Sequence, residues 1–125
     1  MLGSKEARAT IAVRDIDAAA TFYEGRLGLK RVATEGSEAI VYKSGDSMVL
    51  VYRSQYAGTN KATAATWVVG EDLEGIVQAL RAKGVGFEHY DLPDTTRKGD
   101  VHFAGRIRVA WLKDPDGNII ALTSE

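Results

Sequence analysis

The chain carries the same succession of helix signals twice, and this internal repeat restricts its fold more than any other feature. Asp15 and Asp72 each open a stretch with apolar residues at helical spacing, and Gly28 and Gly84 each close one. The two aspartates are 57 residues apart and the two glycines 56. Aspartate is favoured at helix N-caps, and glycine just beyond a helix C-terminus. The spacing therefore predicts two copies of one unit, each with a helix.

Each expected helix has the same neighbours in the sequence. One apolar strand precedes it, at residues 9–13 in the first copy and 65–69 in the second. Three extended segments follow it, which are residues 30–34, 38–43 and 48–53 in the first copy and 85–90, 107–112 and 118–123 in the second. We expect one α+β domain of two βαβββ modules, about 8–53 and 64–124, with a linker at 54–63. Because one helix cannot cover both faces of a four-stranded sheet, the modules should pair and share a concavity.

Composition excludes several classes of function. The 125 residues include 16 Lys and Arg and 17 Asp and Glu, so no overall positive field attracts nucleic acid or an anionic membrane. Cysteine is absent, which removes disulfides, thiol nucleophiles and Cys-ligated metals. No apolar run has the length of a signal peptide core or a membrane span, and we expect a cytoplasmic protein.

Two segments of the second copy carry strong turn signals. A β-hairpin is predicted for W-L-K-D-P-D-G-N-I-I-A-L, residues 111–122, because Pro115 and Gly117 suit a type I turn followed by a left-handed residue. Such a three-residue loop pairs Trp111 with Ala121, so the indole lies beside a small side chain. The polar segment 91–100 contains proline and glycine, and we expect it to be a mobile loop near the mouth of the concavity.

Several short motifs occur in an order that is typical of one protein family. The first copy has V-R-D-I-D at 13–17, F-Y at 22–23 and L-G-L at 27–29, and the second has D-P-D-G-N-I-I at 114–120. With these motifs the chain resembles the glyoxalase/bleomycin-resistance/dioxygenase superfamily, also called vicinal oxygen chelate proteins. Residues 57–67 are similar to one branch of it. The resemblance implies a U-shaped, partly closed mixed sheet with the helices outside and a site inside.

The resemblance also implies where a metal site would lie. Metal-dependent members use four inward-pointing side chains of His, Glu or Gln type, two from each module. The corresponding positions here are Arg8, Ala65 or its neighbour Ala64, Leu50 or an adjacent valine, and Ala121. None of these side chains offers a metal ion an oxygen or imidazole ligand. We therefore expect no metal and no other cofactor.

The favoured hypothesis is a non-enzymatic protein that binds a small apolar or aromatic molecule in the concavity. The expected ligand-binding residues are Arg8, Thr10, Tyr42, Tyr52, Trp67, Trp111 and Ala121. Arg8 would replace a metal ligand by a fixed cation that grips an oxygen anion. In the plainer interpretation the aromatic residues belong to the core and Arg8 lies in solvent. Bleomycin-resistance proteins of the family bind their drug between two chains, which implies a homodimer here.

Two enzymatic alternatives stay open. In one, a lyase, isomerase or dioxygenase uses relocated metal ligands, and His89 and His102 with an aspartate of segment 91–100 are the candidates. In the other, a metal-independent enzyme uses Arg8 to stabilise an oxyanion and His102 or Glu88 to move a proton.

Overall fold

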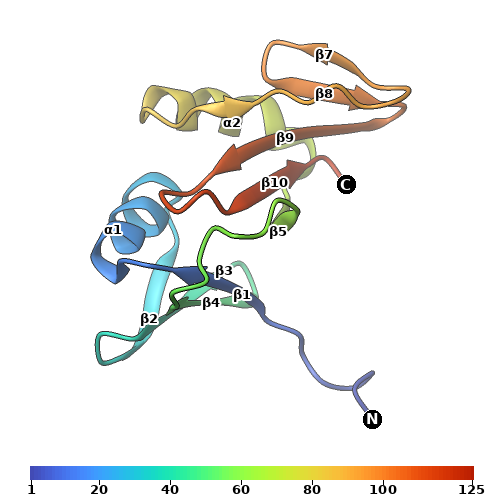
Figure 1. Ribbon diagram of the computed structural model, residues 1–125. Coiled ribbons are helices and arrows are strands. Elements are labelled where there is room, and N and C mark those ends of the chain that lie inside the picture. Colours follow the sequence, from blue (N-terminus) through green and yellow to red (C-terminus); the bar gives the residue numbers. More distant parts are fainter.

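The computed structural model describes residues 1–125 as two units, each with its own sheet and helix (Figure 1). The first unit contains β1 (Ala9–Val13), α1 (Ile16–Ala20), the π-helical turn η1 (Thr21–Arg26), β2 (Lys30–Glu35), β3 (Ala39–Ser44) and β4 (Ser47–Arg53). The second contains β5 (Thr63–Val68), the 3₁₀ turn η2 (Gly70–Asp72), α2 (Leu73–Ala82), β6 (Phe87–Glu88), β7 (Thr96–Lys98), β8 (Val101–Ala104), β9 (Ile107–Lys113) and β10 (Ile119–Thr123). The predicted α+β class with two modules is confirmed.

The first helix begins and ends where the sequence predicts. The Asp15 carboxylate accepts hydrogen bonds from two backbone N–H groups of the first turn, at 2.9 and 3.1 Å. Gly28 ends the helical segment with a φ of 77°. Between them α1 widens into η1, in which the adjacent residues Phe22 and Tyr23 are both buried in the core. The regular helical spacing of the sequence does not indicate this wider turn.

The second helix keeps the predicted apolar stripe but starts differently. Leu73, Val77 and Leu80 are buried, as the spacing predicts. Asp72 makes no capping hydrogen bond, because it belongs to η2 and its backbone is already helical. Gly84 ends the helix with a φ of 84°. No helix in the protein is both long and apolar enough to cross a membrane.

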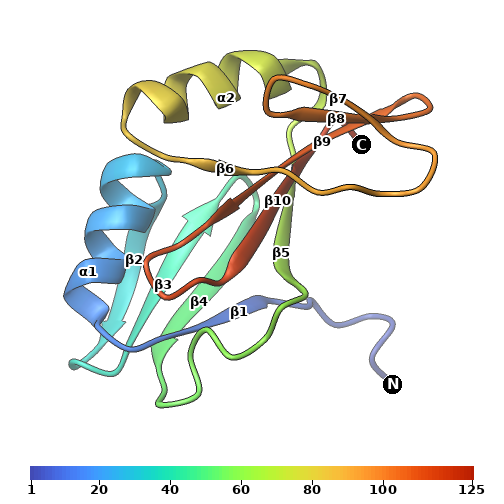
Figure 2. The ribbon, with the colours of Figure 1, turned by 45° about the horizontal axis from the view of Figure 1, so that its top comes forward.

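The sheets are mixed and stay open. The first has the order β1-β4-β3-β2, and the second has the order β5-β10-β9-β8-β7, with β6 also pairing with β9. Strands β1 and β5 lie next to each other at the facing edges of the two sheets, without a hydrogen-bonded ladder (Figures 1 and 2). Helix α1 lies beside the first sheet and α2 over the second.

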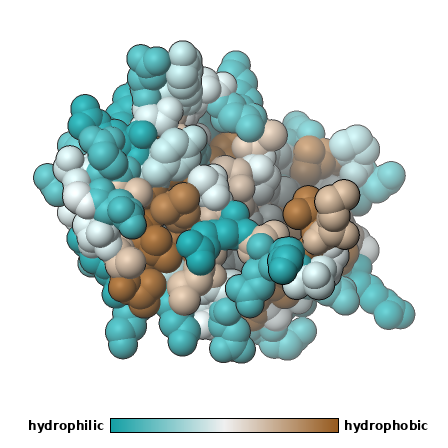
Figure 3. Space-filling view, turned by 90° about the horizontal axis from the view of Figure 1, so that it is seen from below, coloured by the Kyte–Doolittle hydropathy of each residue, from teal (hydrophilic) through white to brown (hydrophobic).

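One apolar core joins the two units. A single cluster of 18 buried side chains includes Ile11 and Tyr42 of the first sheet, Leu112 and Ile120 of the second, and Val77 of α2. Strand alternation therefore gives each sheet a core-facing side, which the helices cover, and a second side, which we call the open face. Figure 3 views the molecule from the side on which the first sheet lies in Figure 1, and apolar side chains gather there between hydrophilic ones.

The turn between β9 and β10 connects the two units by hydrogen bonds. The buried Asp114 carboxylate accepts from the Tyr23 hydroxyl and the Asn118 side-chain amide, each at 2.8 Å. It also accepts from the backbone N–H groups of Asp116 and Asn118, each at 2.9 Å. The same Asn118 amide donates to the Ala12 carbonyl at 2.7 Å. Burial and the Asp114 carboxylate raise the pKa of Tyr23, so its hydroxyl stays a donor.

The prediction of a loop for residues 91–100 is wrong over its last part. Residues 96–98 form β7, which pairs antiparallel with β8. Gly99 has a φ of 63°, whereas the φ of Asp100 is not positive. This combination is typical of a type II′ hairpin turn. The polar side chains do not prevent this strand, because a hairpin at a sheet edge is held by backbone hydrogen bonds and its side chains can stay in solvent.

Candidate functional site

The predicted pairing of Trp111 with Ala121 is confirmed. Gly117 has a φ of 89°, and its N–H donates to the Asp114 carbonyl at 3.0 Å, as a type I turn requires. Ala121 then lies opposite Trp111 on one side and Thr66 on the other. These three residues share the open face of the second sheet, because their strand neighbours face the core.

Trp111 is the centre of an aromatic wall on this open face. Its indole is half-buried. The Tyr90 ring meets it edge-on at a centroid distance of 5.3 Å, and the His102 ring does so at 4.8 Å. Edge-to-face packing of this kind fixes the orientation of an indole. We call Trp111, Tyr90 and His102 the aromatic wall.

His102 is held in a way that limits proton transfer. Its side chain is 1% exposed, and Nε2 accepts the Tyr90 backbone N–H at 3.0 Å. The neutral ring therefore carries its proton on Nδ1, which is buried near the Val109 backbone without a hydrogen bond of good geometry. Burial, and secondarily the charges of His89 and Arg97, lower the pKa of His102. Neither nitrogen is free to meet a substrate, so the predicted role as a base would need the Tyr90 segment to move.

Glu88, the other candidate for proton transfer, lies beside the aromatic wall. It pairs with Trp111 across the β6–β9 ladder, and its carboxylate lies 3.2 Å from the Lys113 ammonium. The ion pair gives the rim of the wall one group of each sign. No substrate-facing acid–base pair follows from this arrangement.

The residues expected for a relocated metal site are only partly brought together. His89 Nε2 lies 2.8 Å from an Asp100 oxygen, and the Arg81 guanidinium contacts the other oxygen. The hydrogen bond from His89, and then that from Arg81, lower the pKa of Asp100. The His102 ring is 6.5 Å from the His89 ring, and its nitrogens point elsewhere. No three His, Asp or Glu side chains gather as metal ligands in the protein.

The positions that the resemblance assigns to metal ligands do not fit a metal either. Leu50 lies on the open face of the first sheet, where it pairs with Thr10, and Ala121 lies on that of the second. Ala65 pairs with Ile120 on the core-facing side. The exposed Arg8 precedes β1 and supplies only hydrogen-bond donors. This donor set cannot hold Zn²⁺, Fe²⁺ or Mg²⁺.

The other predicted binding residues fall on two sides of the sheets. Thr10 and Tyr52 are on the open face of the first sheet. Tyr42 and Trp67 are on the core-facing side, where the Tyr42 hydroxyl donates to Glu24 at 2.8 Å. Burial, and then the hydrogen bond to Glu24, raise the pKa of Tyr42. The seven predicted residues therefore do not surround one pocket.

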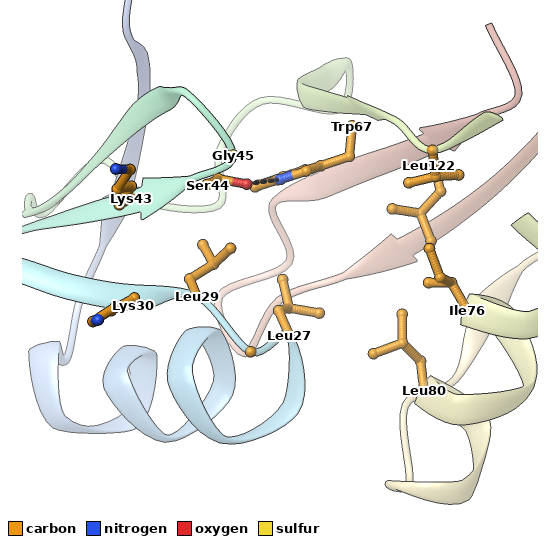
Figure 4. Close-up of a pocket in the computed structure, with 12 residues that line it drawn as sticks. Leu27, Leu29, Lys30, Lys43, Ser44, Gly45, Trp67, Ile76, Leu80 and Leu122 are labelled. Atoms are coloured by element: carbon orange, nitrogen blue, oxygen red, sulfur yellow. Dashed lines mark hydrogen bonds between the residues drawn. The ribbon is translucent and has the colours of Figure 1, made fainter. Parts of the chain in front are cut away.

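Sequence reasoning missed a cavity between the two units on the core-facing side (Figure 4). Its volume is about 290 Å³. Apolar side chains from both units line it, including Leu27, Leu29, Trp67, Ile76, Leu80 and Leu122. The Trp67 indole N–H donates to the Ser44 hydroxyl at 2.7 Å and closes one wall. The L-G-L motif at 27–29, which in the sequence indicates a helix end and is one of the family motifs, supplies part of this lining.

Comparison with known proteins decides the family. The model of the Glyoxalase/Bleomycin resistance protein/Dioxygenase superfamily matches residues 7–122. The chain belongs to this superfamily. No curated protein sequence matches the chain.

Solved structures of superfamily proteins share the fold over nearly the whole chain. Lactoylglutathione lyase from Agrobacterium tumefaciens is 18% identical with a TM-score of 0.72, and the match covers 98% of this chain and 95% of that one. A bleomycin resistance determinant encoded on the transposon Tn5 is 21% identical with a TM-score of 0.69, covering 98% of both chains. The fosfomycin resistance protein FosX from Mesorhizobium loti is 14% identical with a TM-score of 0.70, covering 100% and 94%.

Proposed function

We propose that this superfamily member binds a small apolar or aromatic molecule on the open face of its second sheet. The aromatic wall is the observation that carries the proposal. Trp111 presents a half-buried ring held edge-on by two other rings, and its cross-strand partner on β10 is the small Ala121. Flat aromatic walls favour flat apolar ligands through burial and ring contacts. The donor set at the family's metal positions supports binding over metal-assisted catalysis.

We also propose that a second copy of the chain completes this site. Three large apolar side chains on strands stay exposed on the open faces: Tyr52 at 38%, Val68 at 71% and Ile107 at 39%. Exposed apolar groups on an uncovered sheet face are typical of an interface. Sedimentation of the parent as a dimer, and of V68D/I107D as a monomer, would support the homodimer. A monomeric parent would contradict it.

The binding proposal is tested with 1-naphthol, a neutral aromatic probe, and with bleomycin, because the Tn5 determinant is named for resistance to that drug. Titration calorimetry should detect binding of at least one of the two. Trp111→Ala should weaken it about tenfold or more, because a ring contact and its buried area are lost. Trp67→Phe is the matched control, since Trp67 lies on the other side of the sheet. Equal affinity of the parent and W111A, or no binding of either probe, would contradict the proposal.

A further inference from the structure

The cavity between the two units is lined by aliphatic side chains from both of them. In Figure 4, Ile76 and Leu80 of α2 and Leu122 of β10 face Leu27 and Leu29 of the first unit across it. Its volume of about 290 Å³ is at the lower end of ligand pockets, which run from about 300 Å³ upward. A small apolar molecule in this cavity would contact both units at once.

No charged group faces this cavity. Lys30 and Lys43 are the only charged residues that border it, and they are direct cross-strand partners on β2 and β3, which we call the lysine pair. Strand alternation places both side chains on the open face of the first sheet, opposite the core-facing Tyr42, and their ammonium groups point away from the cavity in Figure 4. An ion in the cavity would lose its hydration without meeting an opposite charge, so the cavity suits a neutral molecule.

One hydrogen-bond donor in the lining has no acceptor in the protein. The Ser44 hydroxyl oxygen accepts the Trp67 indole N–H at 2.7 Å, but the hydroxyl donates to no group in the protein. A hydroxyl can accept and donate at once, and its proton rotates to suit an acceptor. The Trp67 N–H is already used by this hydrogen bond, and the other core-facing side chains of the lining are aliphatic. The cavity therefore offers a ligand one side-chain donor and no charge.

We propose that this cavity is a second binding site, distinct from the aromatic wall, for a small neutral aliphatic molecule with one carbonyl group, such as a ketone. The hydrocarbon part of the ligand packs between the leucines and Trp67. The carbonyl oxygen accepts a hydrogen bond from the Ser44 hydroxyl, whose oxygen keeps its hydrogen bond from Trp67. A carbonyl suits this donor because it accepts a hydrogen bond and brings no proton of its own.

The probe is 2-octanone, and 2-methyl-1-octene is the same molecule with a methylene group in place of the carbonyl oxygen. Each is titrated into ¹⁵N-labelled protein, and both should shift the Trp67 indole N–H signal of the parent, because this group lies at the cavity. Ser44→Ala should weaken 2-octanone about fivefold or more, because a hydrogen bond is lost, and should change the affinity for the alkene by about twofold at most. Ser37→Ala, at an exposed position away from the cavity, is the matched control and should bind both probes like the parent.

Two results would overturn this site. One is an unchanged Trp67 signal when 2-octanone is added to the parent, and the other is a loss of affinity in S44A that is as large for the alkene as for the ketone. Ile76→Trp gives a second test, because it places an indole in the cavity and leaves Ser44 unchanged; 2-octanone binding as tight in I76W as in the parent would also contradict the proposal. The aromatic wall is tested with other probes and through Trp111, so either proposal can fail while the other stands.

Discussion

Two polar regions of the molecule differ in how completely their groups are paired, one in the β9–β10 turn and the other at the cavity between the units. The Asp114 carboxylate is buried, and its oxygens are filled by four donors from the turn and from the first unit. At the cavity between the units, the Ser44 hydroxyl accepts the Trp67 indole N–H but donates to no group in the protein. A fully paired buried network stabilises one structure, whereas an unpaired group beside a cavity can still form a hydrogen bond with a ligand. We therefore interpret the turn as framework and the cavity as a site.

The largest effect is expected at the turn. Asp114→Ala leaves the Tyr23 hydroxyl, the Asn118 amide and two backbone N–H groups without their acceptor, and should lower the free energy of unfolding by at least about 3 kcal/mol. Urea denaturation measures it. Asp116→Ala in the same turn loses only a weak contact with Arg14 and should cost about 1 kcal/mol or less. Equal losses in the two variants would show that the network is not what holds the turn.

The linker should be nearly as sensitive where it touches this turn. A Cβ at Gly58 would lie 2.0 Å from the Asp116 carbonyl oxygen, and the backbone has a φ of 72°. Gly58→Ala should cost about 2–4 kcal/mol from strain and overlap together. Gly36→Ala is the matched control, since its φ of 56° is also positive but open space surrounds it. Thermal unfolding of both variants separates the effect of overlap from that of backbone strain. Similar losses of stability in the two variants would show that the contact with the Asp116 carbonyl contributes little.

An intermediate effect is expected on the pH dependence of stability, through the protonation of His102. Because its folded pKa lies below the unfolded value of about 6.5, the unfolded chain binds a proton first as the pH falls. Stability is then full above that value and declines as the pH falls through it toward the folded pKa. Urea denaturation at pH 7.5 and 5.5 should show this decline in the parent, and a smaller one in His102→Asn. An unchanged decline would assign it to other groups.

The smallest effect, of opposite sign, is expected at the lysine pair. Lys30→Glu places a carboxylate opposite Lys43 and should raise the free energy of unfolding by about 0.2–1 kcal/mol, since repulsion becomes attraction. A lower free energy of unfolding in K30E than in the parent would contradict the idea that the lysine pair destabilises the sheet.

Local signals in the sequence predicted the parts of the fold that depend on backbone conformation alone. The Asp15 cap, the glycine ends of the helices and the turn at Pro115–Gly117 are such features, and the turn fixes the pairing of Trp111 with Ala121. The side of the sheet on which Trp67 lies could not be predicted. The β5–β10 ladder contains a bulge between Ile119 and Ile120, and a shift of one residue sends side chains to the opposite face.

The cavity could not be predicted from the sequence either. Its walls come from segments that are far apart in the chain, and its shape depends on how the two units pack. Lys30 and Lys43 are ordinary surface residues in the sequence and become a pair only through the β2–β3 register. Thr10 and Tyr52 lie on the open face of the first sheet, and Arg8 comes just before β1. That they bind a ligand stays a prediction.

If Trp111 forms the wall of an aromatic binding site, a ligand will perturb Trp111 and leave Trp67 unchanged, and the two tryptophans can be observed separately. The protein has one indole N–H signal from each in a ¹H–¹⁵N NMR spectrum, assigned with W111F and W67F. Titration with 1-naphthol should move the Trp111 signal and leave that of Trp67, which donates to Ser44, in place. A shift of the Trp67 signal alone, or of neither, would contradict the claim.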